Sequence, residues 1–261
     1  MSTAPLACST CKRECVYDRC APFGEGREAA YAVAWRCPEG HGQSLDVCPL
    51  GPLVPARELC LNCGHPYPSA EAEARCDACG LARTACPAAL GLADAPADPV
   101  AVARAVFPRG LFRRGMAILN FAIQEGTDVP DVWLLKAQFL NRVGFNRSAA
   151  QMLAGAVPRF AGAAERIALL LEESFLWAEC ERGVEALRSA DAAAALGSRS
   201  VGTHYLRGRA LALLGRLEEA RDEMNAVRAM DPTNADANRA LGIIEASLRQ
   251  KPKKRWWQFW K

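Results

Sequence analysis

The chain has 261 residues, of which 51% are hydrophobic and 23% are charged, and this composition excludes a disordered chain. Its formal net charge is +3, and residues 251–261 contribute five basic side chains and no acidic one, so residues 1–250 sum to −2. The basic character therefore belongs to the C-terminal segment. The rest of the chain lacks the broad basic surface typical of nucleic-acid-binding proteins.

The N-terminal sequence MSTAPLACSTCKREC has no charged start followed by an apolar stretch, so we expect no secretion signal. Apolar runs such as MAILNFAI and IALLL are far shorter than the ~20 residues needed to cross a bilayer. We therefore expect a cytoplasmic protein. In that reducing compartment, the twelve cysteines favour metal ligation over disulfide bonds.

Eleven of the twelve cysteines precede residue 87, where Gly and Pro are frequent and no helical period is sustained. We predict that residues 1–92 form a zinc-binding region of two small modules, over about 1–52 and 53–92. With His41, these cysteines number twelve candidate ligands, which is enough for three tetrahedral sites. Two Zn²⁺ sites are favoured over three, because the cysteines left over form no further CxxC pair.

The first module contains Cys8 and Cys11 as one pair, and Cys37 precedes His41 in a Pro-Gly turn. This turn resembles a zinc knuckle whose second cysteine has become histidine. The four residues predict a zinc site with three thiolates and one imidazole. Four further cysteines remain open as ligands of this site: Cys15, Cys20, Cys48 and Cys86.

The second module contains two CxxC pairs in LCLNCGHPYPSAEAEARCDACG, Cys60 with Cys63 and Cys76 with Cys79. Glycines directly after the pairs let backbone amides turn toward the sulfurs, and four thiolates satisfy tetrahedral zinc. The segment looks like a zinc ribbon. Because four thiolates leave no coordination position open, we expect a structural ion.

Neither nucleic-acid binding by the ribbon nor catalysis is indicated. The hairpin PYPSAEAEAR carries two glutamates and one arginine, which disfavours contact with phosphates. The chain has only three histidines and contains no HExxH, GxSxG or GxxxxGK[ST] motif. We therefore expect a protein that is not an enzyme.

After LGLADAPADPV, which reads as a connection near residue 95, Ala, Leu, Arg and Glu recur at helical spacing. We predict a helical domain over 97–250. Its helical segments repeat, and Gly110 and Gly144 lie one 34-residue step apart in two successive copies. The copies cover residues 102–126, 131–157, 163–196 and 201–232, followed by a terminal helix at 234–250. The third copy has no turn glycine in register.

The clearest copy, residues 201–232, has small, bulky, turn and closing residues in a fixed order: Gly208, Leu211, Gly215, Ala220, Met224 and Pro232. This copy resembles a tetratricopeptide repeat (TPR), and the resemblance covers about residues 97–250. It implies a mainly α fold in which stacked helical hairpins form an α-solenoid after the small β-rich zinc-ribbon region. In this family the concave groove usually receives a peptide or helix from a partner protein.

The TPR family's best-known binding device is a clamp of Lys, Arg and Asn that holds a C-terminal carboxylate. This chain departs from that clamp. The corresponding groove positions are Leu134, Gln138, Tyr205, Arg209 and Arg239. The resemblance therefore specifies the fold better than the ligand.

The C-terminal segment, residues 251–261, reads KPKKRWWQFWK. As a helix it would place its aromatic side chains within one arc beside a basic cluster, which suits an anionic membrane surface. Docking on a partner protein and packing on the chain's own repeats are the two rivals, and stacking on nucleic acid is a weaker fourth reading. The residues expected to act are Lys253, Lys254, Arg255, Trp256, Trp257, Phe259 and Trp260.

These features predict a non-enzymatic adaptor that binds partner proteins through its TPR groove and zinc ribbons. The basic-aromatic segment would recruit a partner or hold the protein at the inner face of the membrane. One alternative is a nucleic-acid-associated zinc-ribbon regulator. A further alternative is a redox or metal-handling protein, which would hold its metal loosely.

Overall fold

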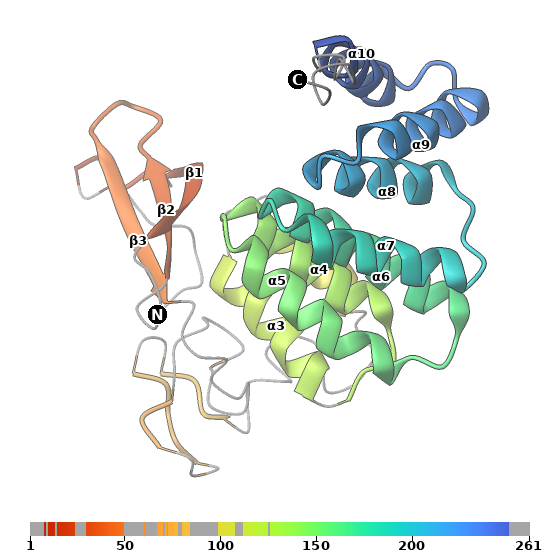
Figure 1. Cartoon of the computed structure of the whole chain (residues 1–261). Coiled ribbons are helices and arrows are strands. Elements are labelled where there is room, and N and C mark those ends of the chain that lie inside the picture. The colour runs from red at the N-terminus through yellow and green to blue at the C-terminus, as the bar shows by residue number, and fades with distance from the viewer. Residues whose placement is uncertain are drawn as a thin grey trace, which may run out of the picture. The chain divides into compact units, whose positions relative to one another are not determined.

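The structure is a computed structural model (Figure 1). It describes residues 8, 10–13, 15–23, 30–49, 60, 67–69, 71, 73–77, 80–83, 99–107, 112–124 and 126–250. The chain divides into two compact units, Met1–Phe145 and Asn146–Lys261. The domain limits predicted from the sequence stay predictions.

The first unit contains a three-stranded antiparallel sheet of β1 (Val16–Phe23), β2 (Ala30–Arg36) and β3 (Gln43–Pro49), in that order. The sequence of β2, AYAVAWR, has the aromatic and β-branched residues that favour strands. Arg36 pairs with Val16 on one side and with Gln43 on the other. The segment before β1 and the connection from β2 to β3 therefore meet at the same end of the sheet.

Among its described residues, the first unit also contains the helices α2 (Pro99–Val106), α3 (Phe112–Gln124) and α4 (Pro130–Arg142), which pack on one another. Three buried rings join them, with centroid distances of 4.9 Å between Phe107 and Phe139 and 5.1 Å between Phe112 and Phe139. Gly115 of α3 lies directly against the Phe107 ring, and a Cβ atom at this position would overlap it. The small residue thus allows the close packing of α2 on α3.

The second unit is a series of helices in which each one packs against its neighbours in the sequence (Figure 1). Successive helices run in opposite directions, and α6 also contacts α8, as α8 contacts α10. Their bounds are α5 (Asn146–Ala156), η5 (Val157–Arg159), α6 (Ala163–Glu179), α7 (Gly183–Ala195), α8 (Val201–Leu213), α9 (Leu217–Met230) and α10 (Ala235–Gln250). The unit is therefore built from helical hairpins, as predicted.

Three predicted packing positions of the clearest repeat, Leu211, Ala220 and Met224, belong to one buried cluster. Its members come from α8, α9 and α10: Leu211, Ala220, Met224, Val227, Ala237, Leu241 and Ile244. Gly208 lets α9 approach α8, because a Cβ atom there would lie 2.9 Å from the Met224 methyl and 3.3 Å from the Ala220 carbonyl oxygen. The terminal helix α10 thus completes the core of the last hairpin.

The turns that follow α4, α6 and α8 each contain a residue in the left-handed conformation. Gly144 and Gly215 have φ of 87° and 72°, and Glu181 occupies the same place between α6 and α7 with φ of 56°. In each turn the next residue donates its N–H to a carbonyl five residues back, as Arg182 does to Trp177 at 2.9 Å and Arg216 to Leu211 at 2.9 Å. The third copy therefore keeps the turn without the glycine. Gly110 lies outside the described residues.

Among the described side chains of the helices, those of Lys136 and Glu173 are charged and buried. Burial lowers the pKa of Lys136 in α4 to about 8. In α6, the Glu173 carboxylate accepts hydrogen bonds from Ser189 Oγ at 2.9 Å and Trp177 Nε1 at 3.2 Å, and burial raises its pKa. Glu173 is thus satisfied by neutral donors, whereas Lys136 bears the full effect of desolvation.

The described helices were also compared with the length and apolar character that a membrane crossing requires. None of them is both long enough and apolar enough to span a bilayer.

Candidate metal centre and repeat surface

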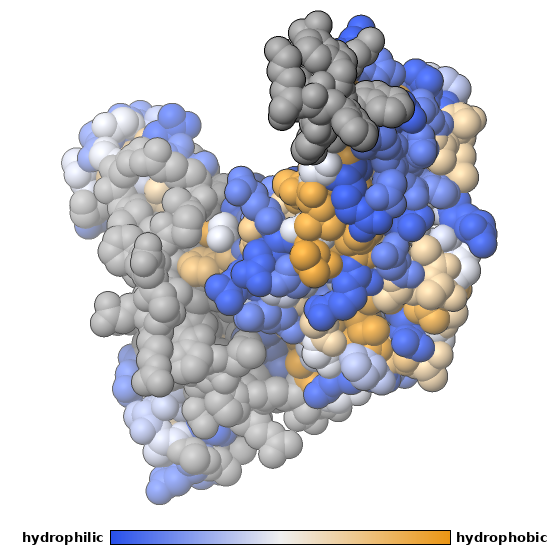
Figure 2. Space-filling view, in the orientation of Figure 1, coloured by the Kyte–Doolittle hydropathy of each residue, from blue (hydrophilic) through white to orange (hydrophobic). Residues whose placement is uncertain are grey.

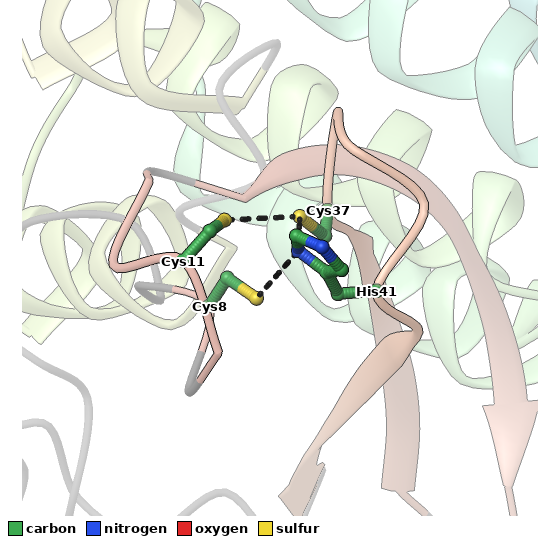
Figure 3. A group of neighbouring side chains, drawn as sticks. All are labelled: Cys8, Cys11, Cys37 and His41. Atoms are coloured by element: carbon green, nitrogen blue, oxygen red, sulfur yellow. Dashed lines mark hydrogen bonds between the residues drawn. The ribbon is translucent and has the colours of Figure 1, made fainter.

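Four of the predicted zinc ligands lie together in the first unit (Figure 3). The Sγ atoms of Cys8, Cys11 and Cys37 and a ring nitrogen of His41 all lie within 4.8 Å of one another. The sulfurs of Cys11 and Cys37 are 3.6 Å apart, and His41 Nδ1 lies 3.6 Å from the Cys37 sulfur and 3.9 Å from the Cys8 sulfur. These four atoms form a small cage.

The dimensions of this cage fit a zinc ion. Tetrahedral coordination with Zn–S bonds of about 2.3 Å places the sulfur ligands about 3.8 Å apart. The separation of 3.6 Å between the Cys11 and Cys37 sulfurs is close to that edge length, and every other pair of ligand atoms lies within 4.8 Å. The donor set, three thiols and one imidazole, is also one that structural zinc commonly takes. The cluster can therefore hold a Zn²⁺ ion after small shifts of the side chains.

The backbone around Cys8 forms a tight turn. The Lys12 N–H donates to the Cys8 carbonyl at 2.9 Å, and the Cys8 N–H donates to the Arg13 carbonyl at 2.8 Å. Lys12 closes this turn with a φ of 63°. Hydrogen bonds from the backbone N–H groups of Cys11 and Thr10 lower the pKa of Cys8 to about 6. The turn therefore favours the thiolate that a metal requires.

The connection between β2 and β3 repeats this plan. The Cys37 N–H donates to the Gly42 carbonyl at 3.2 Å, and the Gly40 N–H donates to the Cys37 carbonyl at 3.0 Å. Gly40 and Gly42 have φ of 77° and 123°, which favour glycine. Because the turn is held by the ends of two paired strands, Cys37 and His41 are presented on a rigid support.

The alternative ligands of the first site have different places. Cys15 is buried but lies outside the four-residue cluster, and burial together with the nearby Cys8 and Cys37 raises its pKa. Cys20 lies within β1 and pairs with Val33, and Cys48 lies within β3 and pairs with Tyr31. Cys86 lies outside the described residues.

For the second predicted site, Cys60 and Cys76 are both buried, and Cys63 and Cys79 lie outside the described residues. The Cys76 turn has the same hydrogen bonds as the Cys8 turn. The Gly80 N–H donates to the Cys76 carbonyl at 2.7 Å, and the Cys76 N–H donates to the Leu81 carbonyl at 3.0 Å. This third copy of the knuckle turn fits the ribbon interpretation, and the four-thiolate site stays a prediction.

The repeat unit exposes an apolar patch where the start of α7 meets the end of α8. Its side chains are Val184, Leu213 and Leu214, which are 66%, 42% and 36% exposed. Leu213 and Leu214 pack beside Gly183, the residue that precedes Val184 at the start of α7. Figure 2 shows apolar surface between hydrophilic flanks on the face that carries these helix ends. We call these three residues the apolar patch.

Charged side chains beside this region are paired between helices. Arg209 of α8 lies 2.6 Å from Glu179 of α6, and its guanidinium lies 5.6 Å from the centre of the Phe175 ring. Arg209 occupies one of the positions compared with the TPR carboxylate clamp. Here it is used to join α6 to α8.

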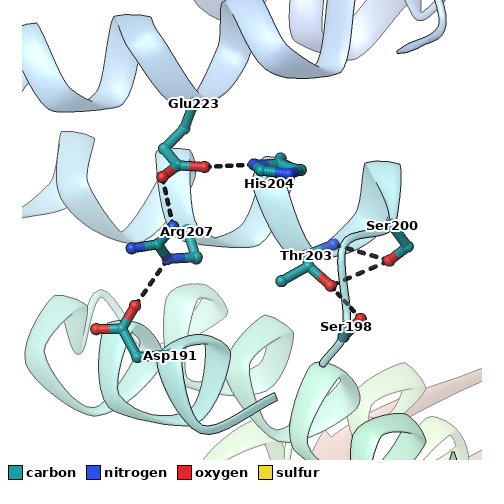
Figure 4. Close-up of polar contacts among 7 residues, drawn as sticks. All are labelled: Asp191, Ser198, Ser200, Thr203, His204, Arg207 and Glu223. Carbon is teal, nitrogen blue, oxygen red and sulfur yellow. Dashed lines mark hydrogen bonds and ion pairs between the residues drawn. The ribbon is translucent and has the colours of Figure 1, made fainter. Parts of the chain in front are cut away.

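His204 takes part in a polar network between α7, α8 and α9 (Figure 4). Its Nδ1 atom lies 2.7 Å from Glu223, whose other oxygen lies 2.6 Å from Arg207. Arg207 also donates to Asp191 at 2.7 Å. The network binds three helices together. At the start of α8, the Ser200 hydroxyl accepts from the Thr203 N–H at 3.2 Å and caps the helix.

The basic-aromatic segment, residues 251–261, lies outside the described residues. Its role and its contacts with lipid, with a partner or with the repeats therefore stay predictions.

No protein-family model matches the chain, and no curated protein gives a significant match. Among solved structures, the chain is similar to the MamA RS-1 ArsTM double mutant, with 15% identity and a TM-score of 0.51 over 60% of this chain and 88% of that one. It is also similar to a MamA fragment from Desulfovibrio magneticus RS-1, with 18% identity and a TM-score of 0.48 over 59% and 88% of the two chains. A C-terminal TPR-containing domain of an FK506-binding protein from Plasmodium falciparum shares 16% identity at a TM-score of 0.42, covering 48% and 91%. The likeness to the first of these structures, together with the stacked helical hairpins, confirms the predicted mainly α, TPR-like fold.

Proposed function

We propose that the chain is a non-enzymatic adaptor that binds partner proteins through its helical repeats. The observation that carries this proposal is the apolar patch of Val184, Leu213 and Leu214. Large apolar side chains that are exposed next to one another typically mark an interaction site. The stacked hairpins support such a site, because each one contributes to a continuous surface.

The zinc-binding region would serve as a second, separately folded interaction module. Cys8, Cys11, Cys37 and His41 would hold one Zn²⁺ ion. The other ion would be held by Cys60, Cys63, Cys76 and Cys79. A bound ion would supply folding free energy to a region too small to build a large core, and four protein ligands would leave no position for substrate.

The basic-aromatic segment would hold the adaptor at an anionic membrane surface. Full-length protein and a version ending at Gln250 should be mixed with liposomes of neutral lipid and with liposomes that contain anionic lipid, because basic segments are attracted to a negative membrane surface. We expect only the full-length protein to float, and only with anionic lipid. If neither version floats, the membrane role is wrong, and docking on a partner protein or packing on the chain's own repeats would account for the segment.

The adaptor proposal can be tested by affinity capture from the cells that produce the protein. The test variant is Val184→Glu with Leu213→Glu, which places two charges in the apolar patch. The control is Met230→Glu, because Met230 is 50% exposed at the end of α9 and lies outside the patch. The wild type and the control should recover the same partner proteins, and the patch variant should lose them. Equal recovery by all three proteins, or no recovery by any, would contradict the proposal.

A further inference from the structure

A pocket of about 240 Å³ lies among the helices of the first unit, on the side where α2 faces α4. Its floor is the group of three buried rings, Phe107, Phe112 and Phe139. Phe107 and Phe139 are nearly parallel, at an interplanar angle of 9°, and Gly115 lies directly against Phe107. The rings are thus held between helices, and the floor is a preformed apolar surface.

Two arginines line the same pocket, Arg104 from α2 and Arg142 from α4. Both are exposed, and neither forms an ion pair within the part of the chain that the structure describes. The Gln138 side chain, also exposed, adds an amide that can donate or accept. The pocket therefore combines an aromatic floor with two guanidinium groups available for an anion.

The charge of the surrounding sequence has the same sign. Residues 99–124 contain four arginines and no acidic residue, and residues 99–142 together carry six basic and three acidic side chains. Residues 99–142 thus have a net charge of +3. Because residues 1–250 have a net charge of −2, the remaining residues, 1–98 and 143–250, have a net charge of −5. The helices that form the pocket are thus a local positive region in an otherwise acidic body.

The size of the pocket restricts its ligand. Sites for small molecules and cofactors usually measure about 300–1,000 Å³, so a volume of about 240 Å³ suits a single large side chain. A side chain buried in a pocket is how peptides are commonly anchored to a groove. The chain's own basic-aromatic segment has suitable aromatic side chains, but its five positive charges would be repelled by the two arginines of the pocket.

We propose that this pocket anchors an acidic peptide of a partner protein. A large apolar side chain of the peptide would lie on the Phe107 and Phe139 rings, and carboxylates next to it would pair with Arg104 and Arg142. Arginine suits this role because its planar fork binds a carboxylate through two hydrogen bonds. No free C-terminus is needed for such a contact. This inference rests on the proposed adaptor function and specifies the chemistry of one ligand.

The test is selection from a random peptide library on immobilised full-length protein. Every peptide is fused at both ends to a carrier protein, so that no peptide offers a free C-terminal carboxylate. Wild type should enrich sequences in which a large apolar residue is flanked by Asp or Glu. The test variant is Arg104→Glu with Arg142→Glu. The control is Arg199→Glu with Arg228→Glu, which makes the same change in net charge at exposed arginines of the second unit.

An enriched peptide is then synthesised with both ends blocked, and its affinity is measured by fluorescence anisotropy. The pocket variant should bind it at least 10-fold more weakly than wild type, and the control variant should match wild type. Replacing the flanking acids by their amides should weaken binding to wild type by a similar factor. Circular dichroism of the pocket variant should be unchanged, because both arginines are exposed.

Three results would overturn the proposal. Enriched peptides without acids that bind the pocket variant as well as wild type would show that binding uses another surface, which leaves the adaptor function intact. No enrichment at all would also reject the acidic-peptide site, and the capture experiment with the apolar-patch variant would still decide the adaptor function. Self-association in sedimentation experiments that the pocket variant abolishes would show that a second copy of the chain occupies the pocket.

Discussion

Replacing Glu181 by glycine should stabilise the repeat unit. A residue with a side chain in the left-handed region costs about 1–2 kcal/mol, because its Cβ atom crowds the backbone. Glycine removes that strain but loses about 0.5–1 kcal/mol in extra chain entropy. At φ of 56°, Glu181→Gly should therefore raise the free energy of unfolding by about 0.5–1 kcal/mol. The Glu181 side chain is exposed, so little packing is lost.

The measurement is urea denaturation of the full-length protein, followed by far-ultraviolet circular dichroism. The midpoint should rise while the dependence on urea concentration stays constant. Thermal unfolding should shift upward by about 1–4 °C. Two controls isolate the cause. Glu181→Ala removes the carboxylate but keeps the Cβ atom, and should leave stability nearly unchanged. Gly215→Ala introduces a Cβ atom at φ of 72° and should destabilise by about 1 kcal/mol.

The reasoning would be refuted if Glu181→Ala stabilised the protein as much as Glu181→Gly does, because the gain would then come from losing a negative charge. It would fail equally if Glu181→Gly lowered the midpoint. In that case the left-handed turn would be maintained by contacts of the glutamate side chain.

Three further predictions concern the metal centre, the buried lysine and the repeat core. Cys37→Ser should lower the zinc content by about one ion per chain, measured by elemental analysis, and leave the helical signal intact, whereas an unchanged zinc content would exclude the four-residue cluster as a site. Lys136→Met should stabilise the protein at pH 7 by about 2–3 kcal/mol, because the folded pKa of Lys136, about 8, lies below the pKa of an unfolded lysine. The unfolded state of the wild type therefore binds more protons than the folded state. As a result, the stability of the wild type rises with pH above about 7. The gap between the two proteins should therefore narrow by about 1 kcal/mol between pH 7 and pH 9, and a constant gap would mean that packing alone is responsible. Met224→Ala should lower the free energy of unfolding by about 2–5 kcal/mol in urea titrations, because Met224 is 1% exposed within the α8–α10 cluster. A loss below ~1 kcal/mol would contradict the packing described.

Most of the repeat architecture could be predicted because local chemistry specifies it. Gly144 and Gly215 mark turns that need a left-handed residue, and Gly208 marks a close helix contact. Both requirements favour glycine, so they can be recognised from the amino-acid sequence. The left-handed conformation of Glu181 could not be recognised in this way, because it is imposed by the two helices that Glu181 joins and not by the residue type.

The metal centre was predictable in part, for a similar reason. Cys8 with Cys11 and Cys37 with His41 are close in sequence, so their spacing shows that each pair forms one turn. That the two turns meet depends on strand register, which brings Arg36 opposite Val16. The pocket of the first unit was not predictable, because Arg104 and Arg142 are far apart in the sequence and each alone is an ordinary surface arginine.

The consecutive contacts of the second unit also decide how it responds to mechanical force. The terminal helix α10 packs on α9 and, to a smaller extent, on α8. A pull on its end would therefore break only the contacts of Ala237, Leu241 and Ile244 before α9 is loaded. The helices would detach one after another from the C-terminal end. Such a unit would extend in small steps under tension, and the hairpins that have not yet detached would stay folded.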